Sequence, residues 1–271
     1  MSSLVKTAVV TGASRGIGKS ILEALVKKGV TVIGTSRKPE NTAPFDKVPG
    51  VAYKALDLTN GASIEGLVKN LEHVDMLINN AGASQMGPVE DMPLDRVRLL
   101  FELVFFGQVR LIQGILPLMR TQGGGRIINI TSFASHTPVP FSAFYAAGKS
   151  ALETFTLGLR SEVRKYGIQV SAVAPTFVKT GISQEKVIKD SSAYSNDYAK
   201  VKAIRDADIA NGCDPSVVAA KVLQVLECKH PAAFYAAGRN AAIMTFMHRF
   251  CPSGLMEKAI RLHFKLDRDP E

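Results

Sequence analysis

Two hydrophobic periods alternate along the first half of this chain, and this alternation constrains the fold more than any other feature. Short runs rich in β-branched residues have the composition of strands, and the segments between them have apolar residues at helical spacing. A chain that repeats strand and helix in this way folds into a parallel sheet with helices on both faces. The predicted strands here are 6–11, 31–36, 51–58 and 74–80, and the predicted helices are 18–29 and 61–73.

Strands and helices continue to alternate after the first half of the chain, and no domain boundary interrupts residues 1–271. It predicts a single α/β domain, doubly wound, with a seven-stranded parallel sheet. The polar segment 175–212 lacks clear periodicity and is predicted to be a substrate flap with one or two short helices. The other predicted strands are 124–132, 168–175 and 232–238, and the other helices are 93–119, 142–166 and one that starts at Asp214 and Pro215.

The charge and the cysteines narrow the range of partners. The formal net charge of +9 favours an anionic partner, such as a phosphorylated cofactor, an acidic lipid surface or nucleic acid. Lys and Arg are scattered rather than clustered with aromatic residues, which argues against nucleic acid. Three cysteines without C-x-x-C or disulfide spacing indicate reduced thiols and a cytoplasmic protein. We find no signal-peptide core and no apolar run of ~18 residues, so no membrane span is predicted.

The segment TGASRGIG (11–18) joins the first predicted strand to the first predicted helix. Glycines at such a turn let the backbone approach a pyrophosphate, and the free N–H groups at the helix start attract anions. Gly12, Gly16 and Gly18 have G-x-x-x-G-x-G spacing, and a plain tight turn would also use glycine here. The strand before the segment and the amphipathic helix after it favour a dinucleotide site.

The residues at the end of the second predicted strand indicate whether NAD or NADP(H) binds. An NAD-binding protein has an acidic residue at this place, which holds the ribose 2′-hydroxyl. This chain has Ser36, Arg37 and Lys38 instead, and Arg15 lies in the glycine loop. Because guanidinium groups bind phosphate with two hydrogen bonds, we expect NADP(H) rather than NAD. A solvated basic strand end is the alternative.

Two more strand ends place polar residues at the same edge of the sheet. Asp57 ends the third predicted strand, where it can accept a hydrogen bond from an adenine amino group. NNAG (79–82) ends the fourth strand. Its asparagines can brace neighbouring backbone, while Ala81 and Gly82 leave room for a ribose.

Ser132, Tyr145 and Lys149 form the candidate reactive group. Tyr145 and Lys149 are four residues apart, so they share a face of a predicted helix. A nearby ammonium lowers the pKa of a phenol, and Tyr145 is therefore predicted to exchange a proton with a carbonyl or alcohol oxygen that Ser132 also holds. A routine surface Tyr–Lys pair is the alternative. The near-copy of FYAAGK at 234–239, FYAAGR, lies in a strand-like run and is predicted not to be catalytic.

These motifs resemble those of the short-chain dehydrogenase/reductase family over roughly residues 4–182. The resemblance implies a Rossmann-type fold, a nicotinamide cofactor, no metal, Tyr145 as the acid/base, Ser132 on the substrate oxygen and Lys149 on the nicotinamide ribose. The C-terminal tail is similar to that of a subgroup with 17β-hydroxysteroid dehydrogenases and yeast-type 1-acyldihydroxyacetone-phosphate reductase. The residues expected to bind the cofactor are Gly12, Ser14, Arg15, Gly16, Ile17, Gly18, Ser36, Arg37, Asp57, Leu58, Asn79, Ala81, Gly82, Tyr145, Lys149, Val178 and Thr180.

The sequence departs from the family pattern at two places. Many relatives have an asparagine in the helix before the fifth strand that helps to hold a water in a proton relay, and here Val104 stands at that place. Either a backbone group and water serve alone or the relay is weakened. The second departure is Thr176, where relatives usually have glycine after the proline. It is expected to alter the backbone beside the nicotinamide without abolishing binding.

The C-terminal segment 239–266 is apolar and carries a basic helix face. Three interpretations remain open: packing on the domain or on a second subunit, a lid over a bulky substrate, and an amphipathic helix in peripheral contact with a membrane. Relatives commonly pair through the long helices 93–119 and 142–166, so a homodimer or homotetramer is expected.

The predicted function is an NADPH-dependent carbonyl reductase that interconverts a bulky or lipid-like ketone and its secondary alcohol. Two alternatives stay open. One is an NADP(H)-binding sensor or scaffold with little turnover, which Val104 favours. The other is a mainly oxidative, NAD-linked alcohol or steroid dehydrogenase.

Overall fold

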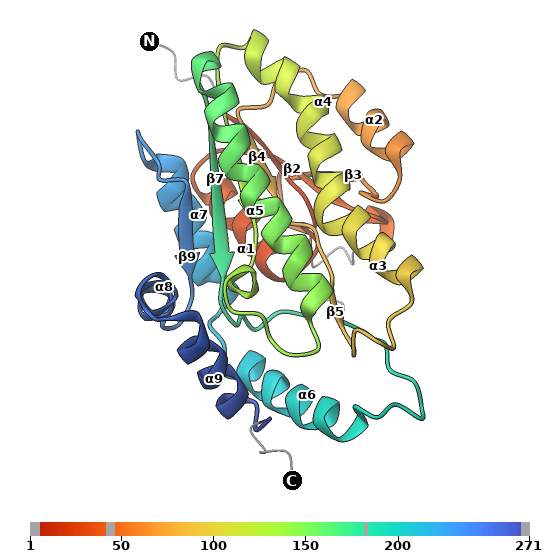
Figure 1. Cartoon of the computed structure of the whole chain (residues 1–271). Helices are drawn as coiled ribbons and strands as arrows, with labels where there is room; N and C mark the ends of the chain where they lie inside the picture. The colour runs from red at the N-terminus through yellow and green to blue at the C-terminus, as the bar shows by residue number, and fades with distance from the viewer. Residues whose placement is uncertain (1–5, 42–46, 182–183, 267–271) are drawn as a thin grey trace.

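A seven-stranded sheet forms the centre of the protein, which we describe from a computed structural model over residues 6–41, 47–181 and 184–266. The strand order is β3-β2-β1-β4-β6-β7-β9, and every pairing in this sheet is parallel (Figure 1). The predicted seven-stranded parallel sheet is thus confirmed. Its strands are β1 (Thr7–Val10), β2 (Thr31–Ser36), β3 (Ala52–Ala55), β4 (Met76–Asn79), β6 (Gly125–Ile130), β7 (Ile168–Pro175) and β9 (Phe234–Ala237).

Helices cover both faces of the sheet because successive side chains of each strand point to opposite faces. In β1, Ala8 and Val10 belong to the core cluster under α1 and α7, whereas Val9 belongs to the cluster under α2, α4 and α5. Both layers are therefore needed to bury one strand, as in other doubly wound folds. The helices are α1 (Gly16–Lys27), α2 (Gly61–Lys69), α3 (Leu94–Phe101), α4 (Gly107–Thr121), α5 (Ala143–Val163), α6 (Ser195–Ala210), α7 (Pro215–Glu227), α8 (Ala241–Phe250) and α9 (Ser253–His263).

The predicted helix 93–119 is interrupted by a π-helical turn, Glu102–Phe106, between α3 and α4. By length and composition, Leu94–Thr121 would be long and apolar enough to cross a membrane. Helices in the core of a soluble protein can have the same length and composition, and Leu111 and Ile115 of this stretch are fully buried against the sheet. One such stretch is weak support for a membrane span.

The segment after β7 is more ordered than its sequence suggests. It contains the 16-residue helix α6 instead of one or two short helices. It also contains β8 (Gln184–Lys186), which pairs in parallel with β5 (Ser84–Met86) in a second, two-stranded sheet. This small sheet fixes one end of the segment beside the carboxyl edge of β4.

The C-terminal helices return across the carboxyl edge of the main sheet, and α9 lies beside α6 (Figure 1). His263 at the end of α9 contacts Asp208 of α6, with Nε2 and Oδ2 2.8 Å apart. Phe264 packs with Met86 and Tyr198 in a small apolar cluster of its own. The end of the chain thus closes over the edge at which parallel sheets bind their ligands.

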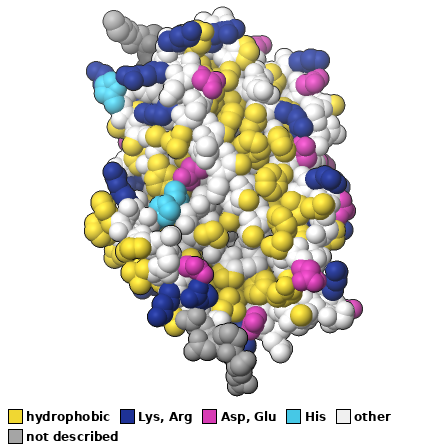
Figure 2. Space-filling model, viewed as in Figure 1, with side chains coloured by type: hydrophobic (Ala, Val, Ile, Leu, Met, Phe, Trp, Pro, Cys, Tyr) yellow, Lys and Arg dark blue, Asp and Glu magenta, His cyan; other side chains and the backbone are white. Residues whose placement is uncertain are grey.

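Hydrophobic side chains also gather on the outer face formed around α4 and α5 (Figure 2). Leu99 of α3, Phe106 of the π-helical turn and Leu157 of α5 are each at least 45% exposed. Exposed apolar patches of this kind mark interaction surfaces.

Candidate active site

A cavity of about 1100 Å³ runs along the carboxyl edge of the sheet, from the glycine loop to the underside of α9. Its size exceeds the ~300–1,000 Å³ that is typical for one ligand, so it has room for two bound molecules. The predicted site residues that line it are Gly12, Ser14, Arg15, Gly16, Ile17, Ser36, Arg37, Asp57, Leu58, Ala81, Gly82, Ser132, Tyr145, Lys149, Val178 and Thr180.

The glycine loop is shaped by two close approaches of the backbone. Gly12 has a φ of +65°, and a Cβ there would lie 2.8 Å from Cα of Ala81. A Cβ at Gly18 would overlap the carbonyl oxygen of Gly12. The sequence predicts that Gly18 contacts the cofactor, but Gly18 does not line the cavity. Its missing side chain instead lets α1 start directly behind the loop. The free N–H groups of the first turn of α1 face an anion-binding position.

The strand ends after β2 and β3 form the far end of the cavity. Ser36 and Arg37 line it, with Arg15 of the glycine loop and Asp57. One carboxylate oxygen of Asp57, Oδ1, accepts hydrogen bonds from the backbone N–H and the hydroxyl of Thr59, at 2.9 and 2.7 Å. This turn fixes the carboxylate at the cavity wall.

The two asparagines of NNAG have different positions. Asn80 lines the cavity and donates to the backbone oxygens of Thr11 and Gly12, at 2.9 and 3.2 Å. Asn79 is fully buried inside the sheet and donates to Oδ1 of Asn129 at 3.0 Å. Asn79, which is predicted to contact the cofactor, does not line the cavity, because its side chain points to the sheet face that α5 covers, where Asn129 also donates to Thr156. Asn80 is the asparagine at the edge.

Ser132, Tyr145 and Lys149 meet at the opposite end of the cavity. Ser132 follows β6, and Tyr145 and Lys149 lie on adjacent turns of α5. Lys149 is 4% exposed and donates from Nζ to the carbonyl oxygen of Ile130 at 2.8 Å. The predicted reactive group is therefore assembled around one space.

The electrostatics of this group differ from the prediction. Burial raises the pKa of Tyr145, opposed by a hydrogen bond with Ser132 and by the positive charge of Arg205. Burial lowers the pKa of Lys149 to about 8. The expected lowering of the tyrosine pKa by Lys149 is wrong in direction, because loss of water around the phenol outweighs the neighbouring charge.

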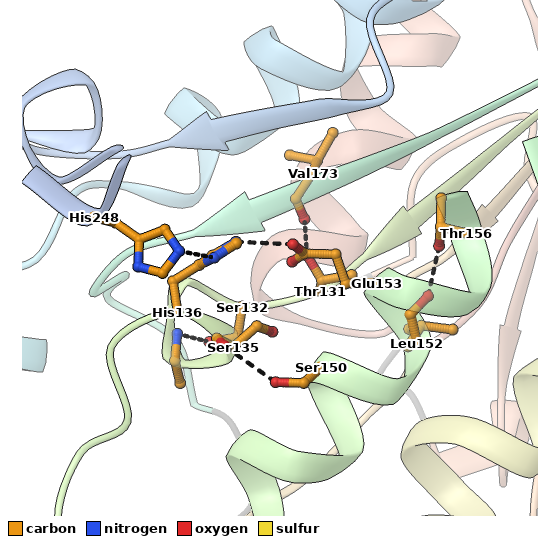
Figure 3. A network of polar contacts seen from close by, with 11 residues as sticks. Thr131, Ser132, Ser135, His136, Ser150, Leu152, Glu153, Thr156, Val173 and His248 are labelled. Carbon is orange, nitrogen blue, oxygen red and sulfur yellow. Dashed lines mark hydrogen bonds and ion pairs between the residues drawn. The ribbon is translucent and has the colours of Figure 1, made fainter. Parts of the chain in front are cut away.

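A polar network joins the loop after Ser132 to the C-terminal helix α8 (Figure 3). Nε2 of His136 lies 2.8 Å from a carboxylate oxygen of Glu153 on α5, and Nδ1 of His136 lies 3.1 Å from Nε2 of His248 on α8. The hydroxyl of Ser150 donates to the carbonyl oxygen of Ser135 at 3.1 Å. The network ties α8 to the loop that carries Ser132.

The two departures from the family pattern are both packing features. Val104 is fully buried in the π-helical turn, and its side chain packs against Gly148, next to Lys149. Thr176 lies so close to Gly238, whose φ is +129°, that a Cβ at Gly238 would overlap the Thr176 hydroxyl. Each larger residue is accommodated by a glycine that faces it.

Sequence reasoning missed some of the residues that line the cavity from outside the family motifs. The most unusual is Arg205 of α6, which is 7% exposed. A pattern of buried positions on α6 (Tyr198, Val201, Arg205) would have placed it inward, but the polar sequence of that helix hides the pattern. The C-terminal segment is not among the missed parts, because a lid is one of its three interpretations. Its apolar residues that line the cavity are Met244, Met247, Met256, Ala259, Ile260 and Phe264.

Comparison with known proteins agrees with this geometry. A sequence model of the family described as short chain dehydrogenase matches residues 6–191. A 3-ketodihydrosphingosine reductase of Bacteroides thetaiotaomicron is 30% identical over 95% of this chain and 97% of its own. An NADPH-dependent 3-dehydrocapnine reductase of Ornithobacterium rhinotracheale is 28% identical over 94% and 95%.

A solved structure gives the same result for the fold. A short-chain dehydrogenase from Streptomyces avermitilis superposes with a TM-score of 0.82 at 30% identity, over 98% of this chain and 100% of that one. The chain therefore belongs to the short-chain dehydrogenase family and is an oxidoreductase that uses a nicotinamide cofactor on a small-molecule substrate.

Proposed function

We propose that this protein uses NADPH to reduce a ketone with a long apolar portion to the secondary alcohol. The observation that carries the proposal is that one cavity is lined both by the glycine loop with Arg15 and Arg37 and by Ser132, Tyr145 and Lys149. The same cavity continues beneath α8 and α9, where its lining is apolar.

The residues at the glycine-loop end fit a phosphorylated dinucleotide. The start of α1 and the cradle at Gly12 suit a pyrophosphate, and Asp57 suits the adenine. Arg15 and Arg37 line the place where an NAD-binding site has an acidic residue, so they would hold a 2′-phosphate. When bound, NADPH supplies the hydride. Thr180 and Val178 would lie beside the nicotinamide.

Tyr145 would protonate the carbonyl oxygen of the substrate. The phenol is protonated at neutral pH, as in an ordinary tyrosine, and burial raises its pKa further. The protonated phenol is the form that can donate to a carbonyl oxygen in reduction. Ser132 would hold the same oxygen by a hydrogen bond. Lys149, with its ammonium already held by the carbonyl oxygen of Ile130, would bind the nicotinamide ribose.

The C-terminal segment is proposed to be a lid. Met247 of α8 and Ile260 of α9 line the cavity, so the two helices cover the space next to Tyr145. Flexible methionine side chains adapt to apolar ligands of varied shape. The names of two relatives, 3-ketodihydrosphingosine reductase and 3-dehydrocapnine reductase, are in line with a keto substrate.

The test is to follow NADPH oxidation with a series of 2-alkanones from six to sixteen carbons and to identify the product by mass spectrometry. We expect one secondary alcohol per NADPH and a kcat/KM that rises with chain length. NADPH binding without turnover on any ketone would instead support a sensor or scaffold, and faster oxidation of alcohols with NAD would support the oxidative alternative.

The exposed apolar face around α4 and α5 is proposed to pair with a second copy of the chain (Figure 2). Leu99, Phe106 and Leu157 would be covered in the dimer. Light scattering should give twice the monomer mass, and Leu157→Glu should give the monomer; an unchanged mass in the variant would count against this face.

A further inference from the structure

Arg205 stands in an unusual place for an arginine. It lies on the inward face of α6, one and two turns after Val201 and Tyr198, and these two side chains are at most 3% exposed. Arg205 itself is 7% exposed and lines the cavity. A charged group this deep costs free energy unless it is paired or hydrogen-bonded, so its presence at the cavity wall requires an explanation.

The contacts of Arg205 leave much of its guanidinium group unused. One terminal nitrogen donates to the hydroxyl of Ser84 at 2.8 Å, and the other lies 3.9 Å from the sulfur of Met86. Among the described residues, no carboxylate lies within 4 Å of it in an ion pair. A guanidinium has five N–H donors, and these two contacts use only part of them.

The carboxylates near Arg205 have other cations as partners. Glu185, which lines the cavity, pairs with Arg96 at 3.1 Å. Asp208, which also lines it, pairs with His263 at 2.8 Å. Asp206 is the sequence neighbour of Arg205, and it pairs with Lys202. The charge of Arg205 is thus available to a ligand that binds in the cavity.

Arg205 lies at the reactive end of that cavity. Arg205 is hydrogen-bonded to Ser84 of β5, β5 packs against α5, which carries Tyr145, and both Arg205 and Tyr145 line the cavity. Beyond Arg205 the lining changes to Met244, Met247 and Ile260 of the C-terminal helices. A substrate that fills both regions has an oxyanion a few bonds from its ketone and an alkyl chain on the other side.

We propose that Arg205 binds an anionic headgroup of the substrate, with the chemistry of a carboxylate, beside the carbonyl that Tyr145 protonates. This inference rests on the proposed ketone reduction and names the class of ketone. Arg205 is the group that selects it, because planar guanidinium and carboxylate groups form paired hydrogen bonds. Ser84 positions the guanidinium through its hydroxyl.

The kinetic test compares 3-oxododecanoate with its methyl ester, which differ in charge but not in chain length. The wild type should have a KM at least about 10-fold lower for the acid, and Arg205→Gln should remove most of this difference by raising the KM for the acid, whereas any change in kcat through Tyr145 should be the same for acid and ester. Arg205→Lys should restore part of it. Lys200→Gln, an exposed cation on the same helix, is the control and should keep the preference.

Two outcomes would overturn the inference. One is a wild type that does not distinguish acid from ester. The other is an Arg205→Gln variant that keeps the lower KM for the acid and loses kcat equally on both substrates with a shifted pH profile, because Arg205 would then act only through Tyr145. If Arg205→Gln does not fold, the same comparison of acid with ester is made with Ser84→Ala and Arg205→Lys. Each should raise the KM for the acid, but by less than Arg205→Gln, and leave the KM for the ester unchanged.

A binding measurement separates this inference from the proposed function. Calorimetry of the NADP-loaded enzyme with dodecanoate and with 1-dodecanol needs no turnover. We expect dodecanoate to bind at least about 10-fold more tightly, and Arg205→Gln to remove the difference. Selective binding of dodecanoate without ketone reduction would overturn the proposed function but support the anion site at Arg205. Ketone reduction without selective binding would support the function and overturn the anion site.

Discussion

Val104 and Gly148 are in such close contact that a Cβ at Gly148 would lie 2.6 Å from Cγ2 of Val104. Val104 belongs to the π-helical turn between α3 and α4, and Gly148 precedes Lys149 on α5. The residue that departs from the family pattern therefore limits how closely α5, which carries Tyr145 and Lys149, approaches the π-helical turn. π-helical turns inside α-helices are often found at functional sites.

Gly148→Ala should destabilise the protein by about 1–3 kcal/mol, because the added methyl overpacks the contact with Val104. In a Val104→Ala background, the same change should be neutral or stabilising, since alanine is preferred to glycine in a helix by about 0.5–1 kcal/mol. Urea unfolding of the wild type, the two single variants and the double variant measures the coupling free energy between residues 104 and 148.

Gly158→Ala is the matched control for this cycle. Gly158 lies on the same helix, and nothing lies within 4 Å of a Cβ placed there. This change should stabilise the protein by up to about 1 kcal/mol in either background. If Gly148→Ala behaved like Gly158→Ala, the close contact with Val104 would be disproved.

Lys149 should make the cofactor-free protein more stable as the solution becomes more alkaline. Burial lowers its pKa from 10.5 to about 8. Between these values the unfolded chain binds the proton and the folded chain does not, so the free energy of unfolding rises with pH across this window. Relative to Lys149→Met, the wild type should gain about 2 kcal/mol between pH 8 and 9.5. Parallel unfolding curves for the two proteins would contradict the assignment.

His248 should release α8 as the pH falls. Burial and the charge of His136 lower the pKa of His248, and Glu153 only partly opposes them. As the pH falls below 6.5, the unfolded chain binds the proton before the folded chain does, so stability is lost as the pH falls from 6.5 to the lower folded-state pKa. Chymotrypsin should cut within α8 faster at pH 5.5 than at pH 7.5.

His248→Gln should remove most of this pH dependence because glutamine does not titrate. His73→Gln, at an exposed ion pair on the other side of the molecule, should keep it. An identical pH response in the wild type and His248→Gln would show that another group controls the release of α8.

Arg37→Asp should exchange the cofactor preference. An aspartate repels the 2′-phosphate and accepts a hydrogen bond from a 2′-hydroxyl, so the Kd of NADPH should rise by about 10- to 100-fold while that of NADH changes little. Lys38→Asp makes the same charge change at a residue that does not line the cavity and should have a smaller effect. Tighter binding of NADH than NADPH by the wild type would refute the role of Arg37.

The sequence predicts the sheet well because each strand is a short apolar run between glycine or polar residues. FYAAGK and FYAAGR are separated correctly for the same reason: Tyr145 lies on α5, and Tyr235 lies on β9. The hydroxyl of Tyr235 accepts a hydrogen bond from the backbone N–H of Ala232 at 2.7 Å, which is a structural role.

The features that the sequence did not predict depend on contacts between distant segments. Arg205 is buried because α6 packs with Met86 and Phe264, which are more than fifty residues away along the chain. The direction of the pKa shift of Tyr145 depends on how much water the folded chain removes from the phenol, and spacing alone does not contain this quantity. The close contact between Val104 and Gly148 likewise joins residues that are far apart in the sequence.

The most direct test of the central claim is single-turnover oxidation of bound NADPH by a ketone, with Tyr145→Phe compared with Tyr235→Phe. Both variants lose one phenol hydroxyl, but only Tyr145 lines the cavity. We predict that Tyr145→Phe binds NADPH as the wild type does and slows the turnover by at least about 100-fold, whereas Tyr235→Phe stays within a few-fold of the wild-type rate. Equal rates for Tyr145→Phe and the wild type would contradict the account.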